Sequence, residues 1–151
     1  MQALIVRPML PADLAAAAAI EACAPEAWTA GQLTEELAAQ QAGGAPRLFV
    51  AAGEAGLLGL AVYQLAAGEA NLCTLTVAPA ARRQGVGRAL LGYAEAWAKA
   101  QGKRALRLDV HEINTPAIKL YESCGFRYIA TVDLGYGAYG LKWFRLYEKL
   151  L

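Results

Sequence analysis

Glycine and arginine residues concentrate in one short segment, Arg82-Arg83-Gln84-Gly85-Val86-Gly87-Arg88-Ala89, which follows the candidate strand Asn71–Val77. A helical pattern begins inside this segment. The first N–H groups of a helix have no intrahelical partners, and the helix dipole favours an anion beside them. Glycines let a phosphate approach the backbone, and arginines add positive charge. The segment therefore predicts a phosphate site at the start of a helix.

The motifs of two large classes of phosphate-binding protein do not fit this segment. It lacks the Gly-x-x-x-x-Gly-Lys-Ser/Thr pattern of nucleoside triphosphatases and the three-glycine pattern of dinucleotide folds. It also lies past the midpoint of the chain. What remains is the short pattern Arg82-x-x-Gly85-x-Gly87, which by itself is equally compatible with a tight turn.

A second block follows one helix and one strand later, and it gives the first block a context. It reads Asn114-Thr115-Pro116-Ala117-Ile118-Lys119-Leu120-Tyr121-Glu122-Ser123-Cys124-Gly125-Phe126. Taken separately, Asn114 could be a helix cap and Tyr121 a core residue. Together, in this order and spacing, the two blocks resemble the two signatures of the GNAT superfamily of acyl-CoA N-acyltransferases.

The resemblance implies acetyl-CoA as the co-substrate. In that superfamily the glycine loop holds the pyrophosphate, and the pantetheine arm lies against the preceding strand. The main chain of Leu75 and Val77 is therefore expected to bind the arm. The residues expected to contact the cofactor are Leu75, Val77, Arg82, Arg83, Gln84, Gly85, Val86, Gly87, Arg88, Ala89 and Asn114.

Direct acetyl transfer to an amine needs a proton donor for the thiolate and a base for the amine. The superfamily commonly places a tyrosine at the Tyr121 position as the donor, and a phenol can protonate a nearby thiolate. Two carboxylates, Asp109 and Glu69, are candidate bases. Either could take the proton from the amine directly or through a water molecule. His111 titrates in the useful range, although a histidine of a surface turn is the more ordinary interpretation.

The acceptor is a primary amine, and two segments resemble the ribosomal-protein-alanine N-acetyltransferases of the superfamily. They are Ala27–Leu33 and Leu108–Phe126. That group carries glutamate where this chain has Asp109, and its tyrosine-and-proline loop is missing from Asp133–Gly140. A peptide N-terminus and a small-molecule amine therefore both stay open as acceptors. Acceptor contacts are expected from Tyr136, Tyr139 and Trp143, which could equally form a core or a homodimer face.

The hydrophobic patterns along the chain predict eleven elements in the order β-α-α-β-β-β-α-β-α-β-β. The strands are Ala3–Arg7, Leu48–Ala52, Leu57–Leu65, Asn71–Val77, Ala105–Val110, Phe126–Val132 and Leu141–Lys149. The helices start near Asp13, Thr29, Gly85 and Asn114. The fold class is α/β. With the resemblance, it becomes a GNAT-type mixed, mostly antiparallel sheet of about seven strands with about four helices, in a single domain over residues 1–151.

Composition limits the other function classes. The formal net charge of +1 gives no field that would favour nucleic acid. No apolar run reaches the roughly 18 residues of a membrane span, and residues 1–7 do not read as a signal peptide, so a cytoplasmic protein is expected. Three cysteines without metal spacing predict reduced, mostly buried thiols and no metal site. A non-catalytic acyl-CoA-binding or regulatory module is the alternative function.

Overall fold

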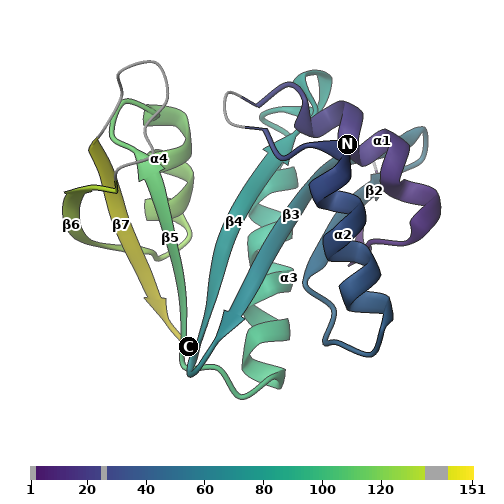
Figure 1. Ribbon diagram of the computed structural model, residues 1–151. Helices are drawn as coiled ribbons and strands as arrows, with labels where there is room; N and C mark the ends of the chain where they lie inside the picture. Colours follow the sequence, from purple (N-terminus) through teal and green to yellow (C-terminus); the bar gives the residue numbers. More distant parts are fainter. Residues whose placement is uncertain (1–2, 25–26, 135–142) are drawn as a thin grey trace. The chain divides into compact units, whose positions relative to one another are not determined.

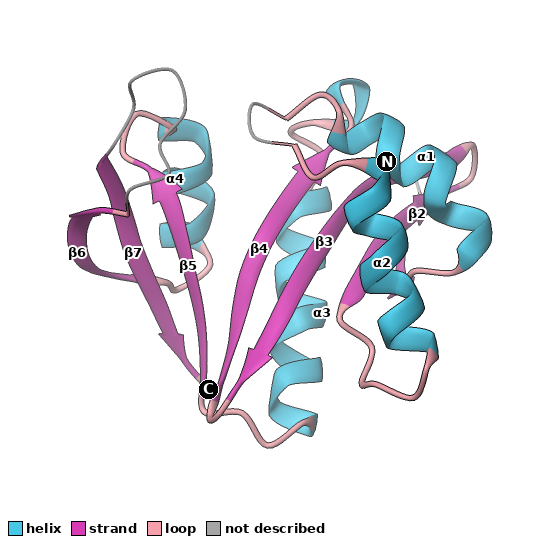
Figure 2. Ribbon diagram, viewed as in Figure 1, coloured by secondary structure: helices cyan, strands magenta, loops and turns pink. Residues whose placement is uncertain are grey.

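The computed structural model describes residues 3–24, 27–134 and 143–151. The strands are β1 (Ile5–Pro8), β2 (Leu48–Gly53), β3 (Gly56–Ala66), β4 (Glu69–Val77), β5 (Ala105–His111), β6 (Arg127–Asp133) and β7 (Trp143–Leu150). The α-helices are α1 (Leu14–Glu21), α2 (Ala30–Gln41), α3 (Val86–Ala100) and α4 (Thr115–Ser123). Short 3₁₀ turns, η1 (Pro11–Asp13) and η2 (Pro79–Ala81), precede α1 and α3 (Figures 1 and 2).

The strands follow the order β1-β2-β3-β4-β5-β7-β6 in one sheet. β1–β2, β2–β3, β5–β7 and β6–β7 pair antiparallel, and β4 pairs with β5 in parallel. The predicted α/β fold, with a mixed and mostly antiparallel sheet, is therefore confirmed. The parallel pairing of β4 with β5 comprises four residue pairs, from Glu69 with Ala105 to Leu72 with Leu108.

The chain divides into two compact units. The N-terminal unit contains Met1–Gln64 and Cys73–Tyr93, and the C-terminal unit contains Leu65–Leu72 and Ala94–Leu151. The chain therefore crosses from one unit to the other three times, within β3, β4 and α3, each of which contributes residues to both. The prediction of a single domain stays a prediction.

In the N-terminal unit, side chains of opposite strand faces pack against different helices, as alternation requires. Leu48 and Val50 of β2 form a buried cluster with Leu33 and Leu37 of α2. The Phe49 ring on the other face lies 5.2 Å from that of Tyr93 on α3. Figure 1 shows the same arrangement, with α1 and α2 on one side of β2 and β3 and α3 on the other.

In the C-terminal unit, one face of the sheet is apolar and the other is polar. Leu106, Leu108 and Val110 of β5 are buried, whereas Arg107 and Asp109 between them are exposed. The β5–β7 register pairs Arg107 with Glu148 and Asp109 with Leu146. Charged side chains of neighbouring strands therefore line up on the polar face.

Several local predictions need correction. Asp13 stands at the N-cap position of α1, as predicted, but its side chain makes no capping hydrogen bond to that helix; its carboxylate accepts the Leu10 N–H at 2.8 Å and pairs with Arg7, which stabilises the preceding 3₁₀ turn. β4 begins at Glu69, because Glu69 and Ala70 pair with β5. His111 does not lie in a surface turn; it is the last residue of β5, and its ring is 4.2 Å from that of Phe144.

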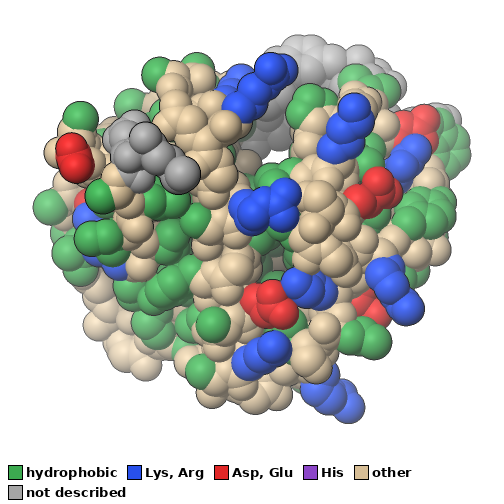
Figure 3. All heavy atoms as spheres, turned by 180° about the vertical axis from the view of Figure 1, so that it is seen from behind, with side chains coloured by type: hydrophobic (Ala, Val, Ile, Leu, Met, Phe, Trp, Pro, Cys, Tyr) green, Lys and Arg blue, Asp and Glu red, His purple; other side chains and the backbone are tan. Residues whose placement is uncertain are grey.

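The cysteines are less buried than predicted. Cys23 is exposed, and Cys73 and Cys124 are half-buried; all three lie among the described residues, and none forms a disulfide. Within the described ranges, no helix is both long and apolar enough to cross a membrane, and no group of metal-binding side chains was found. On the face shown in Figure 3, basic and acidic side chains are interspersed, in keeping with the net charge of +1.

Candidate functional site

The glycine and arginine segment connects η2 to α3 through two residues in the left-handed backbone region. Arg83 has φ 63° and Gly85 has φ 81°. No atom lies within 4 Å of where a Cβ on Gly85 would stand, so the backbone conformation is what requires glycine there, not crowding. The open space beside Gly85 also leaves the main chain at the helix start accessible to a ligand.

The start of α3 has the polarity that an anion site needs. The first i to i−4 hydrogen bond of this helix runs from the Ala89 N–H to the Gly85 carbonyl, at 3.0 Å. The Ala89 N–H is thus already used within the helix, and the N–H groups that precede it face the helix end. Val86 and Gly87 are buried, whereas Gly85 is exposed. Among the backbone N–H groups predicted to bind the pyrophosphate, that of Ala89 is therefore the least available to a ligand.

Polar side chains surround this helix start. Arg82, Arg83 and Arg88 are all exposed. The Gln84 amide donates to the Ala80 carbonyl at 3.3 Å, which ties the loop to η2. The three positive charges lie within seven residues of chain around the positive end of the α3 dipole, so they reinforce one another in favouring an anion.

The second half of β4 carries the two residues expected to bind the pantetheine arm, Leu75 and Val77, both half-buried. Their neighbours Thr74 and Thr76 point to the opposite face of the strand, where both hydroxyls donate to the carboxylate of Glu21 at the end of α1. This confirms the predicted alternation at these positions. The glutamate had no signal in the sequence, because it stands in an alanine-rich helix and its side-chain partners come from a distant strand.

The remaining predicted residues lie in the C-terminal unit, where β5 leads into α4. Asn114 is the N-cap of α4, and its side-chain oxygen accepts the Ala117 N–H at 3.3 Å. The helix-cap alternative for Asn114 is thus present in the structure, and a cofactor contact from this residue stays a prediction. Gly125 closes the helix with φ 93°.

Tyr121 faces inward from α4 and is 7 % exposed. Its ring makes an edge contact with Phe126, at 5.9 Å between centroids. Burial, together with the negative charge of Asp109, raises the pKa of Tyr121 to about 12. The electrostatic influence of Asp109 connects the two residues that the sequence assigned to proton donation and proton acceptance.

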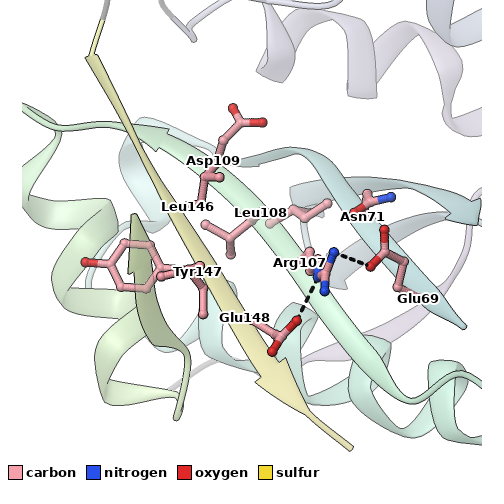
Figure 4. Close-up of a pocket in the computed structure, with 10 residues that line it drawn as sticks. Glu69, Asn71, Arg107, Leu108, Asp109, Leu146, Tyr147 and Glu148 are labelled. Carbon is pink, nitrogen blue, oxygen red and sulfur yellow. Dashed lines mark hydrogen bonds and ion pairs between the residues drawn. The ribbon is translucent and has the colours of Figure 1, made fainter. Parts of the chain in front are cut away.

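Glu69, the other predicted base, is held in an ion-pair cluster. Arg107 contacts Glu69 at 2.8 Å and Glu148 at 2.7 Å, across three neighbouring strands. The two carboxylates, Glu148 first, raise the pKa of Arg107. In Figure 4 both dashed contacts converge on Arg107, and the Asp109 carboxylate stands apart from the cluster. Sequence reasoning missed Arg107 and Glu148, because the register of β7 is set by a long connection.

Glu69 and Asp109 lie at different levels of the sheet. Glu69 pairs with Ala105, four residues before Asp109 on β5, and a strand advances by about 3.3 Å per residue. The backbone positions of the two residues are therefore separated by about 13 Å along the strand direction. Of the two, Asp109 is the one that acts electrostatically on Tyr121.

A hollow of about 350 Å³ lies on the polar face of the C-terminal unit (Figure 4). Asp109 and Leu146 line it at one level, and Glu69, Arg107 and Glu148 line it at another. Trp143, at the start of β7, is 47 % exposed and does not line the hollow. The other two predicted acceptor contacts, Tyr136 and Tyr139, lie outside the described residues.

Comparisons with known proteins agree with this architecture. The chain is 42 % identical over 66 residues to the [ribosomal protein bS18]-alanine N-acetyltransferase of Escherichia coli K12, covering 44 % of this chain and 45 % of that protein. It is 38 % identical over 85 residues to the streptothricin acetyltransferase of Streptomyces lavendulae, covering 54 % and 45 %. The matches thus span about half the length of these curated relatives.

Solved structures extend the likeness to the whole fold. The crystal structure of the ribosomal-protein-S18-alanine N-acetyltransferase from Escherichia coli matches with a TM-score of 0.82 and 28 % identity, over 98 % of this chain and 94 % of that one. A GCN5-related N-acetyltransferase from Kribbella flavida matches with a TM-score of 0.73 and 32 % identity, over 99 % and 98 %.

The family assignment rests on a match that includes both signature blocks. The sequence model of the Acetyltransferase (GNAT) family matches residues 15–126. That span runs from α1 through the glycine loop to the end of the Tyr121 block. The chain therefore belongs to the Acetyltransferase (GNAT) family, whose members are N-acetyltransferases that use acetyl-CoA.

Proposed function

We propose that this protein moves an acetyl group from acetyl-CoA to a primary amine by direct attack in a ternary complex. The observation that carries the proposal is the environment of Tyr121, a buried phenol under the influence of the Asp109 carboxylate. A buried, neutral phenol is a suitable proton donor, and a carboxylate is a suitable base for an ammonium group. The family assignment supplies the acyl donor.

Acetyl-CoA binding is assigned to the N-terminal unit. The main chain from Gln84 to Gly87 would hold the pyrophosphate at the start of α3, with Arg82, Arg83 and Arg88 neutralising its charge. The accessible main chain at Gly85 and the three exposed arginines support this role. The strand before the loop would hold the pantetheine arm through main-chain bonds from Leu75 and Val77.

The proposed reaction can be described by the path of the protons among the amine, Asp109, Tyr121 and the sulfur of CoA. An amine attacks the thioester carbonyl only when neutral, so its ammonium proton passes to Asp109, directly or through a water. Nitrogen then bonds to the carbonyl carbon and passes a second proton to solvent water, and the C–S bond breaks as sulfur departs with the electron pair; Asp109 later releases its own proton to solvent. Tyr121 donates its hydroxyl proton to that sulfur, and solvent returns a proton to the phenol.

The raised pKa of Tyr121 decides when its proton moves. A phenol with a pKa of about 12 is a weaker acid than a thiol, with a pKa of about 8.5, so proton transfer from the resting Tyr121 is unfavourable even to a fully formed thiolate. Neutralisation of Asp109 by the amine proton removes one of the two causes that raise the pKa of Tyr121. Proton uptake at Asp109 thus favours proton release at Tyr121.

The acceptor is proposed to be the α-amine of a protein N-terminus, with a small-molecule amine as the second candidate. Similarity to the [ribosomal protein bS18]-alanine N-acetyltransferase supports the first, and similarity to the streptothricin acetyltransferase supports the second. The ribosomal-protein-alanine N-acetyltransferases carry a glutamate at the position of Asp109, so the proposed base of this chain is one methylene shorter. A water between Asp109 and the amine would compensate for the shorter side chain.

Tyr121→Phe tests the proposal. We expect kcat to fall at least about 100-fold, the usual contribution of a positioned proton donor, while the Kd for acetyl-CoA stays unchanged. Release of the CoA thiol is measured with an N-terminal alanine peptide and with a panel of small primary amines.

Tyr128→Phe is the matched control for that variant, because Tyr128 is an exposed tyrosine on β6 that bonds Thr131. It should retain turnover. Wild-type protein that binds acetyl-CoA and acetylates none of the amines would favour the non-catalytic acyl-CoA-binding module. Equal turnover of wild type and Tyr121→Phe would remove Tyr121 from the mechanism.

A further inference from the structure

Glu21, the last residue of α1, is completely buried. Its carboxylate accepts hydrogen bonds from the Thr76 hydroxyl at 2.6 Å, the Thr74 hydroxyl at 3.0 Å and the Trp28 N–H at 2.9 Å. All four residues belong to the N-terminal unit. One side chain therefore joins the end of α1, the approach to α2 and the second half of β4.

The donors around Glu21 are all neutral. Within the described part of the chain, no lysine, arginine or histidine forms an ion pair with it. Burying a carboxylate without a cation costs several kcal/mol, as an order of magnitude, unless hydrogen bonds offset that cost. An apolar contact would join the same elements at lower cost. A buried residue of this kind usually serves to fix the local geometry of the chain and not to increase its stability.

The position that this network fixes is Leu75. It stands between Thr74 and Thr76, so its side chain points to the opposite face of β4 while its N–H and C=O lie in the plane of the strand. The Thr76 carbonyl is also approached closely by β3, since a Cβ on Gly59 would lie 2.9 Å from it. Glu21 therefore binds the strand on one face, and the backbone of Gly59 lies close to its main chain.

We infer that Glu21 is a positioning residue for the acyl-CoA site, fixing the Thr74–Thr76 segment so that the Leu75 main chain is presented to the pantetheine arm. This inference rests on the proposed binding of acetyl-CoA. The short Thr76 contact has the length of a charge-assisted O–H···O⁻ bond. Both carboxylate oxygens accept hydrogen bonds, so a neutral amide at this position would place an NH2 donor against one of the donors that the carboxylate satisfies.

The test compares two ligands that differ in the pantetheine arm. Acetyl-CoA contains the arm; adenosine 3′-phosphate 5′-diphosphate contains the nucleotide and pyrophosphate alone. We expect Glu21→Gln to raise the Kd for acetyl-CoA about tenfold and to leave the Kd for the nucleotide within about twofold. A general loss of structure would weaken both ligands, so the selective loss identifies positioning of β4.

Variants at Thr76 keep the test decisive if Glu21→Gln fails to fold. Thr76→Val keeps the shape and removes the hydroxyl, whereas Thr76→Ser keeps the hydroxyl. We expect the selective loss of acetyl-CoA affinity in the valine variant and its rescue in the serine variant. Glu36→Gln, which breaks the Arg47 ion pair on α2, is the control for loss of a carboxylate elsewhere in the unit.

Two results would overturn the inference. One is equal acetyl-CoA affinity in wild type, Glu21→Gln and Thr76→Val. The other is a parallel loss of both ligands in Glu21→Gln and Thr76→Val, which would make Glu21 a general stabilising residue. If wild-type protein binds neither ligand, the proposed function itself fails, and that result is distinguishable because it requires no variant.

Discussion

Tyr121 and Glu21 are both buried acids, but their surroundings differ in kind. Tyr121 has an aromatic neighbour and feels a negative charge, so its neutral form is favoured. Three hydrogen-bond donors surround Glu21, an environment that suits a carboxylate. Residue type and spacing identified Tyr121 in the sequence, yet the sequence contains no trace of what surrounds it. Glu21 was invisible, because its two side-chain partners, Thr74 and Thr76, lie more than fifty residues away.

The raised pKa of Tyr121 has a consequence for stability at high pH. An unfolded tyrosine ionises near its ordinary pKa of 10, whereas the folded one ionises at about 12. The unfolded state therefore loses its proton first, and folding stability falls as pH rises from 10 to 12. Relative to Tyr121→Phe, wild-type protein should lose about 3 kcal/mol of unfolding free energy over this range.

Urea denaturation of both proteins at pH 9, 10, 11 and 12 measures this difference. All other tyrosines and lysines are common to the two proteins, so their titration cancels in the comparison. Parallel stability curves over the whole range would show that the folded phenol ionises as it does in the unfolded chain. The burial of Tyr121 would then not have the electrostatic effect described above.

At the scale of elements, local sequence rules predicted correctly those features that depend only on residues close together in the chain. Thr29 caps α2 together with Gln32 in a reciprocal capping box, as its position suggested. Gly53 and Gly56 close the β2–β3 hairpin. The same rules failed where the limits of an element depend on a pairing partner that is distant in the sequence. β4 was predicted two residues short, because its first residues are held in place by β5 and carry no strand signal of their own.

Two glycines of the α3 region should respond oppositely to alanine. Gly85 has φ 81°, so Gly85→Ala should lower the unfolding free energy by about 1–2 kcal/mol and weaken acetyl-CoA binding. Gly92 lies within α3 with no atom within 4 Å of an added Cβ. Gly92→Ala should therefore raise the unfolding free energy by about 1 kcal/mol. Thermal denaturation and acetyl-CoA titration measure both effects, and equal changes in the two variants would contradict the assigned role of Gly85.

At the scale of the whole molecule, the order of elements was enough to predict the fold class. Seven strands and four helices in that order left few topologies, and the sheet has the predicted mixed character. The division into two compact units was not foreseen. It does not follow the chain order, since Leu65–Leu72 belongs with the last third of the chain. Patterns along a sequence report neighbours in the chain, and such a division depends on contacts between distant segments.

The threading of β4 and α3 through both units predicts cooperative unfolding. Neither unit can lose these elements without disturbing residues of the other. Trp28 reports on the N-terminal unit, and Trp97 and Trp143 report on the C-terminal unit. Fluorescence of a Trp28→Phe variant and of a Trp97→Phe/Trp143→Phe variant should therefore give coincident denaturation midpoints, once each is corrected for its own change in stability by circular dichroism. Separate midpoints would instead indicate two domains.

The position of β7 between β5 and β6 has a consequence for synthesis on the ribosome. β6 leaves the ribosome before β7, yet β7 is its partner in the sheet and also pairs with β5 over seven residues. Until β7 emerges, the nascent chain exposes a row of unsatisfied N–H and C=O groups on β5. This interval, when a chaperone would protect the chain best, ends only when β7 has left the ribosome.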